Sequence, residues 1–226
     1  FRRVLFRSGI SSMAIICAVT NSNGSVYYAL MQTYGDDIDC ACMPILAIND
    51  GPFLTLVALG ASGLADIPIM SLVAALVPII AGMILGNLDN KVTEFFGPVG
   101  DAIIPFTGFS LGAGIDLANV LKGGVSGIVL GLITIFIGGG FIYLCDHFIG
   151  RRPGYAAWAV ATTAGNAVAV PAVIGTSDPA WAEFVGTATV QVAASTVLSA
   201  LLVPFIVSWW AKKFGCPKFP KEAKTE

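Results

Sequence analysis

One apolar segment is interrupted near its middle by the stretch Thr162-Thr163-Ala164-Gly165-Asn166-Ala167-Val168-Ala169-Val170-Pro171. The whole segment, residues 154–176, is long enough to cross a bilayer as a helix. Its centre nevertheless holds a glycine, a primary amide and a proline, which lacks the N–H that a helix interior needs. We therefore predict a broken transmembrane helix. Irregular backbone at this depth is stable only where protein or a watery cavity satisfies its hydrogen bonds, so the break predicts a binding site.

A second apolar segment, residues 9–34, has the same feature. It carries no charge, and its centre reads Thr20-Asn21-Ser22-Asn23-Gly24-Ser25, with an Asn beside a Gly at about mid-length. Two interrupted hydrophobic segments at corresponding depths are the usual sequence sign of a secondary transporter built from repeats.

The composition places the chain among membrane proteins. Of the 226 residues, 56% are hydrophobic and only 12% are charged, whereas about 25% are charged in a soluble domain. We therefore predict an all-α polytopic helix bundle in the lipid bilayer. The net charge of −2 and the lack of a basic run with interleaved aromatic residues argue against nucleic acid as a partner.

Cysteine and histidine usage predicts neither a disulfide framework nor a metal site. The five cysteines are an odd number, and neither Cys40-Ala41-Cys42 nor the pair of Cys145 and the single histidine, His147, has the ligand spacing of a zinc site. The apolar segments also hold no His-Glu-x-x-His motif and no Ser/Lys pair, so an intramembrane hydrolase lacks its catalytic groups. We expect no cofactor and no metal, and a transporter rather than an enzyme.

Polar or Gly/Pro-rich joints divide the chain into seven predicted spans. These are residues 9–34, 39–63, 67–86, 98–115, 123–146, 154–176 and 179–211. Alternate joints place Lys91, Arg151, Arg152 and the lysines of the tail on one side and only Lys122 on the other. The positive-inside rule then predicts a cytoplasmic C-terminus.

The order of the spans predicts an inverted repeat. The first and sixth spans are both broken, each precedes a long span, and the topology runs them in opposite directions. We expect residues 64–211 to form one five-helix unit and residues 9–63 to be the last two helices of a preceding unit, with three helices absent upstream. Residues 1–8 are interpreted as a non-native leader, and residues 212–226 as a Lys-rich cytoplasmic tail.

One ionisable side chain lies near the middle of a span. Asp50, in Asn49-Asp50-Gly51-Pro52, is at the centre of the second span. A carboxyl group at bilayer depth is costly and is normally kept for an ion or proton pathway. We predict that Asp50 carries the coupling proton, with Asp116 among the next candidates. The structural alternative is a protonated acid that caps a freed backbone carbonyl.

An anionic ligand would have to be held without a cationic side chain, because no Arg or Lys lies within the spans. Asn23 and Asn166 lie where half-helices can restart, and unpaired N–H groups at a helix start suit a carboxylate. The predicted substrate-binding residues are Asn23, Gly24, Ser25, Thr163, Asn166, Gln191 and Ser195. For the hydroxyl-bearing residues, interhelical packing is an equal alternative.

Several motifs resemble one family, the 2-keto-3-deoxygluconate permeases of bacterial inner membranes. The resemblance covers nearly all of the chain after Gly9. Its motifs are Asn23-Gly24, Tyr27, Met31-Gln32-Thr33-Tyr34-Gly35, Gly51-Pro52, Leu85-Gly86-Asn87-Leu88-Asp89, Phe95-Phe96, Ile104-Pro105-Phe106, Leu111-Gly112 and Ile115-Asp116-Leu117.

The resemblance implies a ten-helix protein with two inverted five-helix repeats, similar to the bile-acid/sodium symporters, in which two broken helices cross. It also implies proton-coupled uptake of 2-keto-3-deoxygluconate. The resemblance further implies an acid at the position of Asn49, whereas this chain has its acid at Asp50. A sodium-coupled organic-anion symporter and a non-transporting membrane sensor stay open as alternatives, as does a homodimer.

Overall fold

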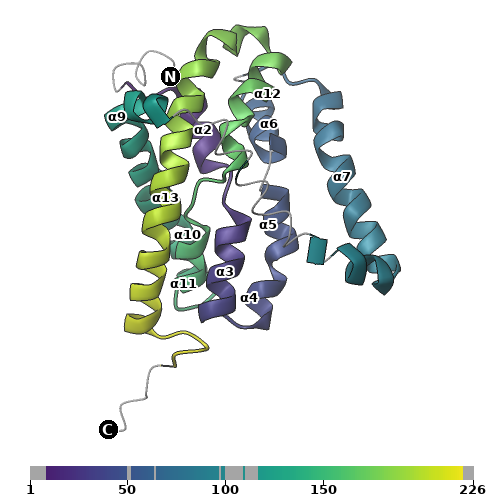
Figure 1. Cartoon of the computed structure of the whole chain (residues 1–226), viewed down its shortest axis with the longest axis vertical. Helices are drawn as coiled ribbons and strands as arrows, with labels where there is room; N and C mark the ends of the chain where they lie inside the picture. The colour runs from purple at the N-terminus through teal and green to yellow at the C-terminus, as the bar shows by residue number, and fades with distance from the viewer. Residues whose placement is uncertain are drawn as a thin grey trace.

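The computed structural model describes residues 9–49, 52–63, 65–96, 98–99, 109 and 117–220, and over these residues the chain is all-α, as predicted, apart from one isolated bridge between Cys216 and Phe219. Figure 1 shows the helices as an elongated bundle. They include α2 (Ser12–Val19), α3 (Gly24–Tyr34), α4 (Asp37–Ala41), α5 (Met43–Asn49), α6 (Pro52–Ala61), α7 (Ile69–Leu88), α9 (Leu117–Leu132), η2 (Ile133–Gly138), α10 (Gly139–Phe148), α11 (Tyr155–Val160), η3 (Asn166–Val168), α12 (Val170–Ser177), η4 (Pro179–Phe184) and α13 (Val185–Phe214).

Both segments that the sequence predicts to be broken are interrupted in the structure. In the first, α2 ends at Val19 and α3 begins at Gly24. In the second, α11 ends at Val160, and the chain resumes with the 3-10 turn η3 and then α12. The two segments run in opposite directions, because α2 lies above α3 while α12 lies above α11 (Figure 1).

The longest helix, α13, runs beside both interrupted segments and packs closely on α9. Close approach requires glycine on α9, because a Cβ on Gly127 would lie 2.5 Å from the Cβ of Ala194 on α13. One turn further on, a Cβ on Gly131 would lie 2.8 Å from Leu198 Cδ2. Small residues four positions apart are the usual way for membrane helices to bring their backbones together.

Two hydrophobic clusters lie on the two sides of the interruptions. The first packs α2, α12 and the first half of α13 together, and its buried members include Met13, Cys17, Ile174, Trp181 and Val192. The second packs α3, α11 and the second half of α13 together, and its buried members include Tyr27, Met31, Tyr155, Val203 and Val207. The polar interruptions therefore lie between two apolar layers, with α13 common to both.

Two helical stretches are long and apolar enough to cross a membrane by length and composition, Gly124–Phe148 and Pro179–Phe214. The first joins the end of α9, the π-helical turn η2 and α10, and corresponds to the predicted fifth span. The second joins η4 and α13 and corresponds to the seventh. The predicted fourth span, 98–115, lies almost entirely outside the described residues, so the count of seven spans and the repeat architecture stay predictions.

Candidate functional site

The two interruptions meet and hydrogen-bond to each other across the middle of the bundle. The Ala164 N–H donates to the Asn21 carbonyl oxygen at 2.9 Å. In the other direction, the Asn23 N–H donates to Thr162 Oγ1 at 2.8 Å. Backbone groups that leave a helix at this depth need such partners, and here each interruption supplies some of them to the other.

Hydroxyl groups of α13 satisfy much of the second interruption. Ser199 Oγ accepts from the Thr163 N–H at 2.9 Å, and Ser195 Oγ lies 2.7 Å from Thr163 Oγ1. Thr196 Oγ1 donates to the Ala164 carbonyl oxygen at 3.1 Å. Thr163, Ser195 and Ser199 are fully buried. These hydroxyls therefore hold the irregular backbone in place within the apolar bundle.

The first interruption is satisfied by its own amide and by the following span. The fully buried Asn21 donates through Nδ2 to the Cys17 carbonyl oxygen at 2.9 Å and to Thr55 Oγ1 of α6 at 2.7 Å. Asn49, the last residue of α5, donates to Ser22 Oγ at 2.8 Å. Asn21 is thus the side chain that closes this break, and α5 and α6 support it.

The two restarting half-helices begin differently. Asn23 is the N-cap of α3, and its Oδ1 accepts from the Val26 N–H at 3.1 Å. Asn166 is the first residue of η3, where Gly165 occupies the N-cap position and no side chain caps the turn. The expectation that Asn restarts a half-helix as its N-cap therefore holds for α3 only. N–H groups in the first turn of an α-helix have no intrahelical partner, so the start of α3 directs donors toward the place where the two interruptions cross. In η3, by contrast, the Ala167 and Val168 N–H groups already donate to the Ala164 and Gly165 carbonyl oxygens.

The predicted binding residues differ in their access to solvent. Gly24, Thr163 and Ser195 are buried, Asn23 and Asn166 are half-buried, and Ser25 is exposed. Because the two interruptions contact each other, Asn23 and Asn166 belong to one crossing. That the two amides hold a ligand between them stays a prediction.

Gln191 lies away from this crossing. Its Oε1 accepts from the Ser11 N–H at 2.9 Å, and its Nε2 donates to the Gly9 carbonyl oxygen at 2.8 Å and to Ser126 Oγ at 3.1 Å. These bonds tie the start of α2 and the helix α9 to α13. The contacts of Gln191 are therefore those of a structural anchor. Asp50 and Asp116, the predicted coupling residues, lie outside the described residues.

At one end of the bundle, a buried ion pair joins the helix that follows the first interrupted segment to the loop that precedes the second. Arg152 Nη2, in the loop before α11, lies 2.7 Å from Asp39 Oδ1 of α4. The Asp39 side chain is 1% exposed, and its Oδ2 also accepts from the Tyr155 hydroxyl at 2.7 Å. Burial is the largest single influence and lowers the pKa of the Arg152 guanidinium, but Asp39, Tyr155 and Asp36 together outweigh it, and the pKa is raised.

The exposed neighbour Asp36 completes this network. It caps α4, because its carboxylate accepts from the Asp39 N–H, and this bond holds the pKa of Asp36 below its ordinary value. Asp36 lies 3.8 Å from Arg152 Nη2 with its side chain 40% exposed. The strong contact of Arg152 is therefore the one to Asp39.

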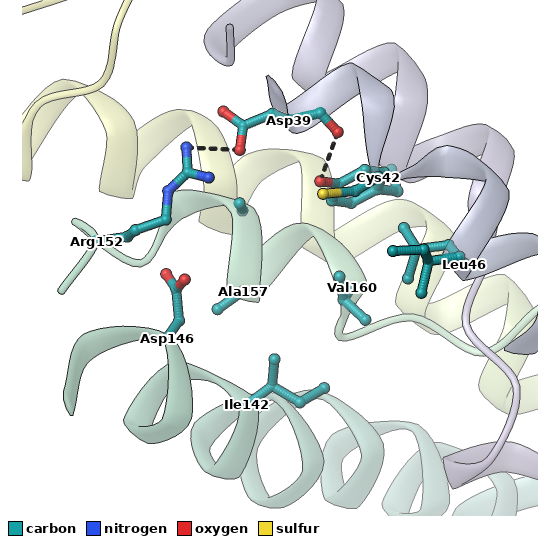
Figure 2. Close-up of a pocket in the computed structure, with 11 residues that line it drawn as sticks. Asp39, Cys42, Leu46, Ile142, Asp146, Arg152, Ala157 and Val160 are labelled. Atoms are coloured by element: carbon teal, nitrogen blue, oxygen red, sulfur yellow. Dashed lines mark hydrogen bonds and ion pairs between the residues drawn. The ribbon is translucent and has the colours of Figure 1, made fainter. Parts of the chain in front are cut away.

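A cavity of about 280 Å³ lies beside this ion pair (Figure 2). Polar side chains line one end, and Figure 2 shows the Asp146 carboxyl in this space beneath Arg152. The apolar remainder ends at Val160, the last residue of α11 before the interruption. Its lining includes Tyr27, Asp39, Cys42, Leu46, Ile142, Asp146, Arg152 and Val160.

A model of a protein family described as 2-keto-3-deoxygluconate permease matches residues 6–216. The chain belongs to the 2-keto-3-deoxygluconate permease family. The resemblance seen in the sequence motifs is thereby confirmed. The description of the family names a permease, which is a membrane transport protein.

Relatives of the chain with this name match most of its length. The 2-keto-3-deoxygluconate permease 1 of Salmonella typhimurium is 49% identical over 205 residues, which are 91% of this chain and 64% of that protein. The permease of Pectobacterium carotovorum is 39% identical over 96% of this chain and 67% of its own length. That of Bacillus subtilis is 36% identical over 92% and 63%. The chain spans about two thirds of the length of these curated relatives, and no solved structure matches it.

Sequence reasoning missed the ion pair, although the sequence contained a signal for it. Asp39 lies after the first span, and Arg152 after the fifth. The topology count places both joints on the same side of the membrane, and opposite charges on one side are candidates for pairing. Asn21 was missed for another reason, since two Asn residues lie in the same break and only tertiary packing decides which one is buried.

Proposed function

We propose that the protein is a secondary transporter for 2-keto-3-deoxygluconate or a similar small sugar-acid anion, coupled to protons, in the bacterial inner membrane. The family and the names of the relatives support the substrate class. The observation that carries the proposal is the crossing itself, where two oppositely directed helices break and restart in contact with each other.

The carboxylate of the substrate binds at the start of the half-helix α3. Asn23 uses its Oδ1 for the Val26 N–H, so the N–H groups of Gly24 and Ser25 stay without an intrahelical partner. A helix start also carries a partial positive charge, which favours an anion. The amides of Asn23 and Asn166 and the exposed hydroxyl of Ser25 are suited to the sugar hydroxyls.

The coupling proton resides on Asp50. Its neighbour in the sequence, Asn49, donates to Ser22 in the first interruption. This adjacency links the proposed proton site to the proposed binding site. When the proton binds, a carboxylate at membrane depth is neutralised, which removes much of its cost in that environment.

Uptake of labelled 2-keto-3-deoxygluconate into membrane vesicles containing the protein tests the transport function. We expect accumulation that follows a pH gradient and not a sodium gradient. Accumulation driven by sodium alone would favour the sodium-coupled alternative. Binding of the labelled compound without accumulation under either gradient would favour a sensor.

Variants at the crossing test the binding site. Asn166→Ala removes one amide from the proposed contacts, and Asn23→Ser keeps an N-cap acceptor while removing the amide donors. Each loses about 1–3 kcal/mol of binding free energy, roughly fivefold to a hundredfold in affinity. Asn87→Ala is the matched control, because Asn87 is an exposed amide on α7 whose side chain, among the residues that the structure describes, bonds its own helix at the Met83 carbonyl oxygen. Unchanged affinity in both crossing variants would refute the site.

A variant at Asp50 tests the coupling. Asp50→Asn abolishes the accumulation of substrate against its gradient, while the exchange of bound substrate continues, because exchange needs no net movement of protons. A variant that still concentrates the substrate normally would move the coupling role to another acid, with Asp116 among the next candidates.

A further inference from the structure

An aromatic cluster fixes the ends of α10 and α13 against each other. The Tyr143 ring lies 5.0 Å from the Trp210 ring in an edge-on arrangement, and the Trp210 and Phe214 rings are 4.4 Å apart. Trp210 Nε1 donates to the Pro153 carbonyl oxygen at 2.7 Å. This bond also holds the loop between α10 and α11 against α13, so the region is a fixed structure.

Beside the cluster lies a second cavity, of about 550 Å³. Its walls combine aromatic rings with basic side chains, and no acidic residue lines it among the described part of the chain. The lining includes Tyr143, His147, Arg151, Arg152, Trp210 and Phe214. The cavity is therefore electropositive and apolar at once, which suits a ligand with an anionic head and an apolar body.

Arg151 is the cation available to such a ligand. Arg152 is already paired with Asp39, whereas Arg151 is exposed and forms no ion pair with the residues that the structure describes. The backbone of Arg151 has a φ of 52°, a left-handed conformation that is uncommon for a residue with a side chain. Conformations of this kind persist where the surrounding structure imposes them, and they gather at functional sites.

The cavity lies where two helical stretches that are long and apolar enough to cross a membrane both end. The stretch Gly124–Phe148 ends with α10, and Pro179–Phe214 ends with α13. Next to the cavity, Lys213 Nζ lies 4.6 Å over the Trp209 ring. Aromatic rings beside lysine and arginine at helix ends are typical of the interface between the hydrocarbon and the lipid headgroups. The phosphates of the lipids therefore lie at the level of this cavity.

We propose that this cavity binds an anionic phospholipid, with Arg151 contacting the headgroup phosphate. Guanidinium groups bind phosphate through charge-assisted hydrogen bonds. The rings of Tyr143, Trp210 and Phe214 cover the apolar part of the lipid next to the headgroup. Basic pockets between membrane helices are recognised lipid-binding features. The site is separate from the crossing and does not depend on the proposed transport function.

Native mass spectrometry of the protein purified in a neutral detergent tests the proposal. We expect retained phosphatidylglycerol and little retained phosphatidylcholine when both are added in equal amounts. Arg151→Gln should lower the occupancy by phosphatidylglycerol about fivefold, which corresponds to one basic residue near a membrane surface. Arg151→Gly should do the same and fold at least as well, because glycine accepts the left-handed backbone.

Lys212→Gln is the matched control. It removes one positive charge from the end of α13 that borders the cavity, but Lys212 itself does not line the cavity. We expect it to leave the occupancy unchanged. If Lys212→Gln and Arg151→Gln lower the lipid occupancy equally, the lipid is attracted by the general surface charge, and the proposal is overturned. Displacement of the lipid by inorganic phosphate at equal concentration would also overturn it, since the site would then recognise phosphate alone.

Discussion

The two interruptions meet at one crossing, yet they are stabilised by different chemistry. The first is closed by an amide in the break itself, Asn21, and by Thr55 of α6. The second is closed by hydroxyl groups of a neighbouring helix, Ser195 and Ser199 of α13. Segments that run in opposite directions through one bundle thus arrive at similar backbone breaks through different side chains.

The restarts of the two helices differ in the same way. α3 begins with a side-chain cap from Asn23, whereas η3 begins with a 3-10 turn that has no side-chain cap. The first break therefore depends on its own Asn21 and Asn23 together with Thr55 of α6, and the second on hydroxyl groups of α13. We expect substitution of the α13 hydroxyl residues to damage the second break more than the first, and substitutions at the ion pair to affect the support of both segments.

The largest effect is expected at the ion pair. Arg152→Gln leaves the buried Asp39 carboxylate without its cation, and the loss of one partner of a buried pair costs about 3 kcal/mol or more. Because this pair ties α4 to the loop before α11, both interrupted segments lose support. The measurement is the free energy of unfolding of the purified protein in detergent.

Asp36→Asn is the control for this prediction. Asp36 is 3.8 Å from Arg152 Nη2 and 40% exposed, and exposed ion pairs contribute little. Asn also remains a good cap for α4. Equal destabilisation by Arg152→Gln and Asp36→Asn would show that the pair with Asp39 does not dominate the network.

A smaller effect is expected at the second interruption. Ser199→Ala leaves the Thr163 N–H without its acceptor in a fully buried site, which costs about 2 kcal/mol. Thr55→Val in the first interruption removes an acceptor of Asn21, but Asn21 keeps the Cys17 carbonyl oxygen as a partner. We therefore expect Ser199→Ala to lower the free energy of unfolding more than Thr55→Val does. The reverse order would contradict the reading that the second break depends on α13.

The helical fold and the two breaks could be predicted because their causes are local. Glycine, asparagine and proline within an uncharged apolar run weaken a helix wherever it lies. The capping role of Asn23 is local too, since it involves the N–H three residues ahead. These features depend on short stretches of sequence, and the structure has them where the sequence places them.

The partners of the breaks could not be predicted in the same way. Gln191, expected near the binding site, bonds Ser11 and Gly9, which are more than a hundred residues away in the sequence. Ser199 and Thr55 resemble the many other small hydroxyl residues of membrane helices. Which of them faces a break depends on how α6 and α13 pack, and periodicity within one helix does not supply that information.

The smallest effect concerns the cap that distinguishes the two restarts. Asn23→Ala removes the acceptor of the Val26 N–H, and the loss of an N-cap costs about 1 kcal/mol. Asn23→Ser keeps an acceptor and should be close to neutral in stability. Asn166→Ala removes no cap, because Gly165 occupies that position in η3. The expected order of unfolding free energies thus places Asn23→Ala below Asn23→Ser. If Asn23→Ser is as unstable as Asn23→Ala, the amide of Asn23 contributes more than a cap, and the two restarts are more alike than their backbones indicate.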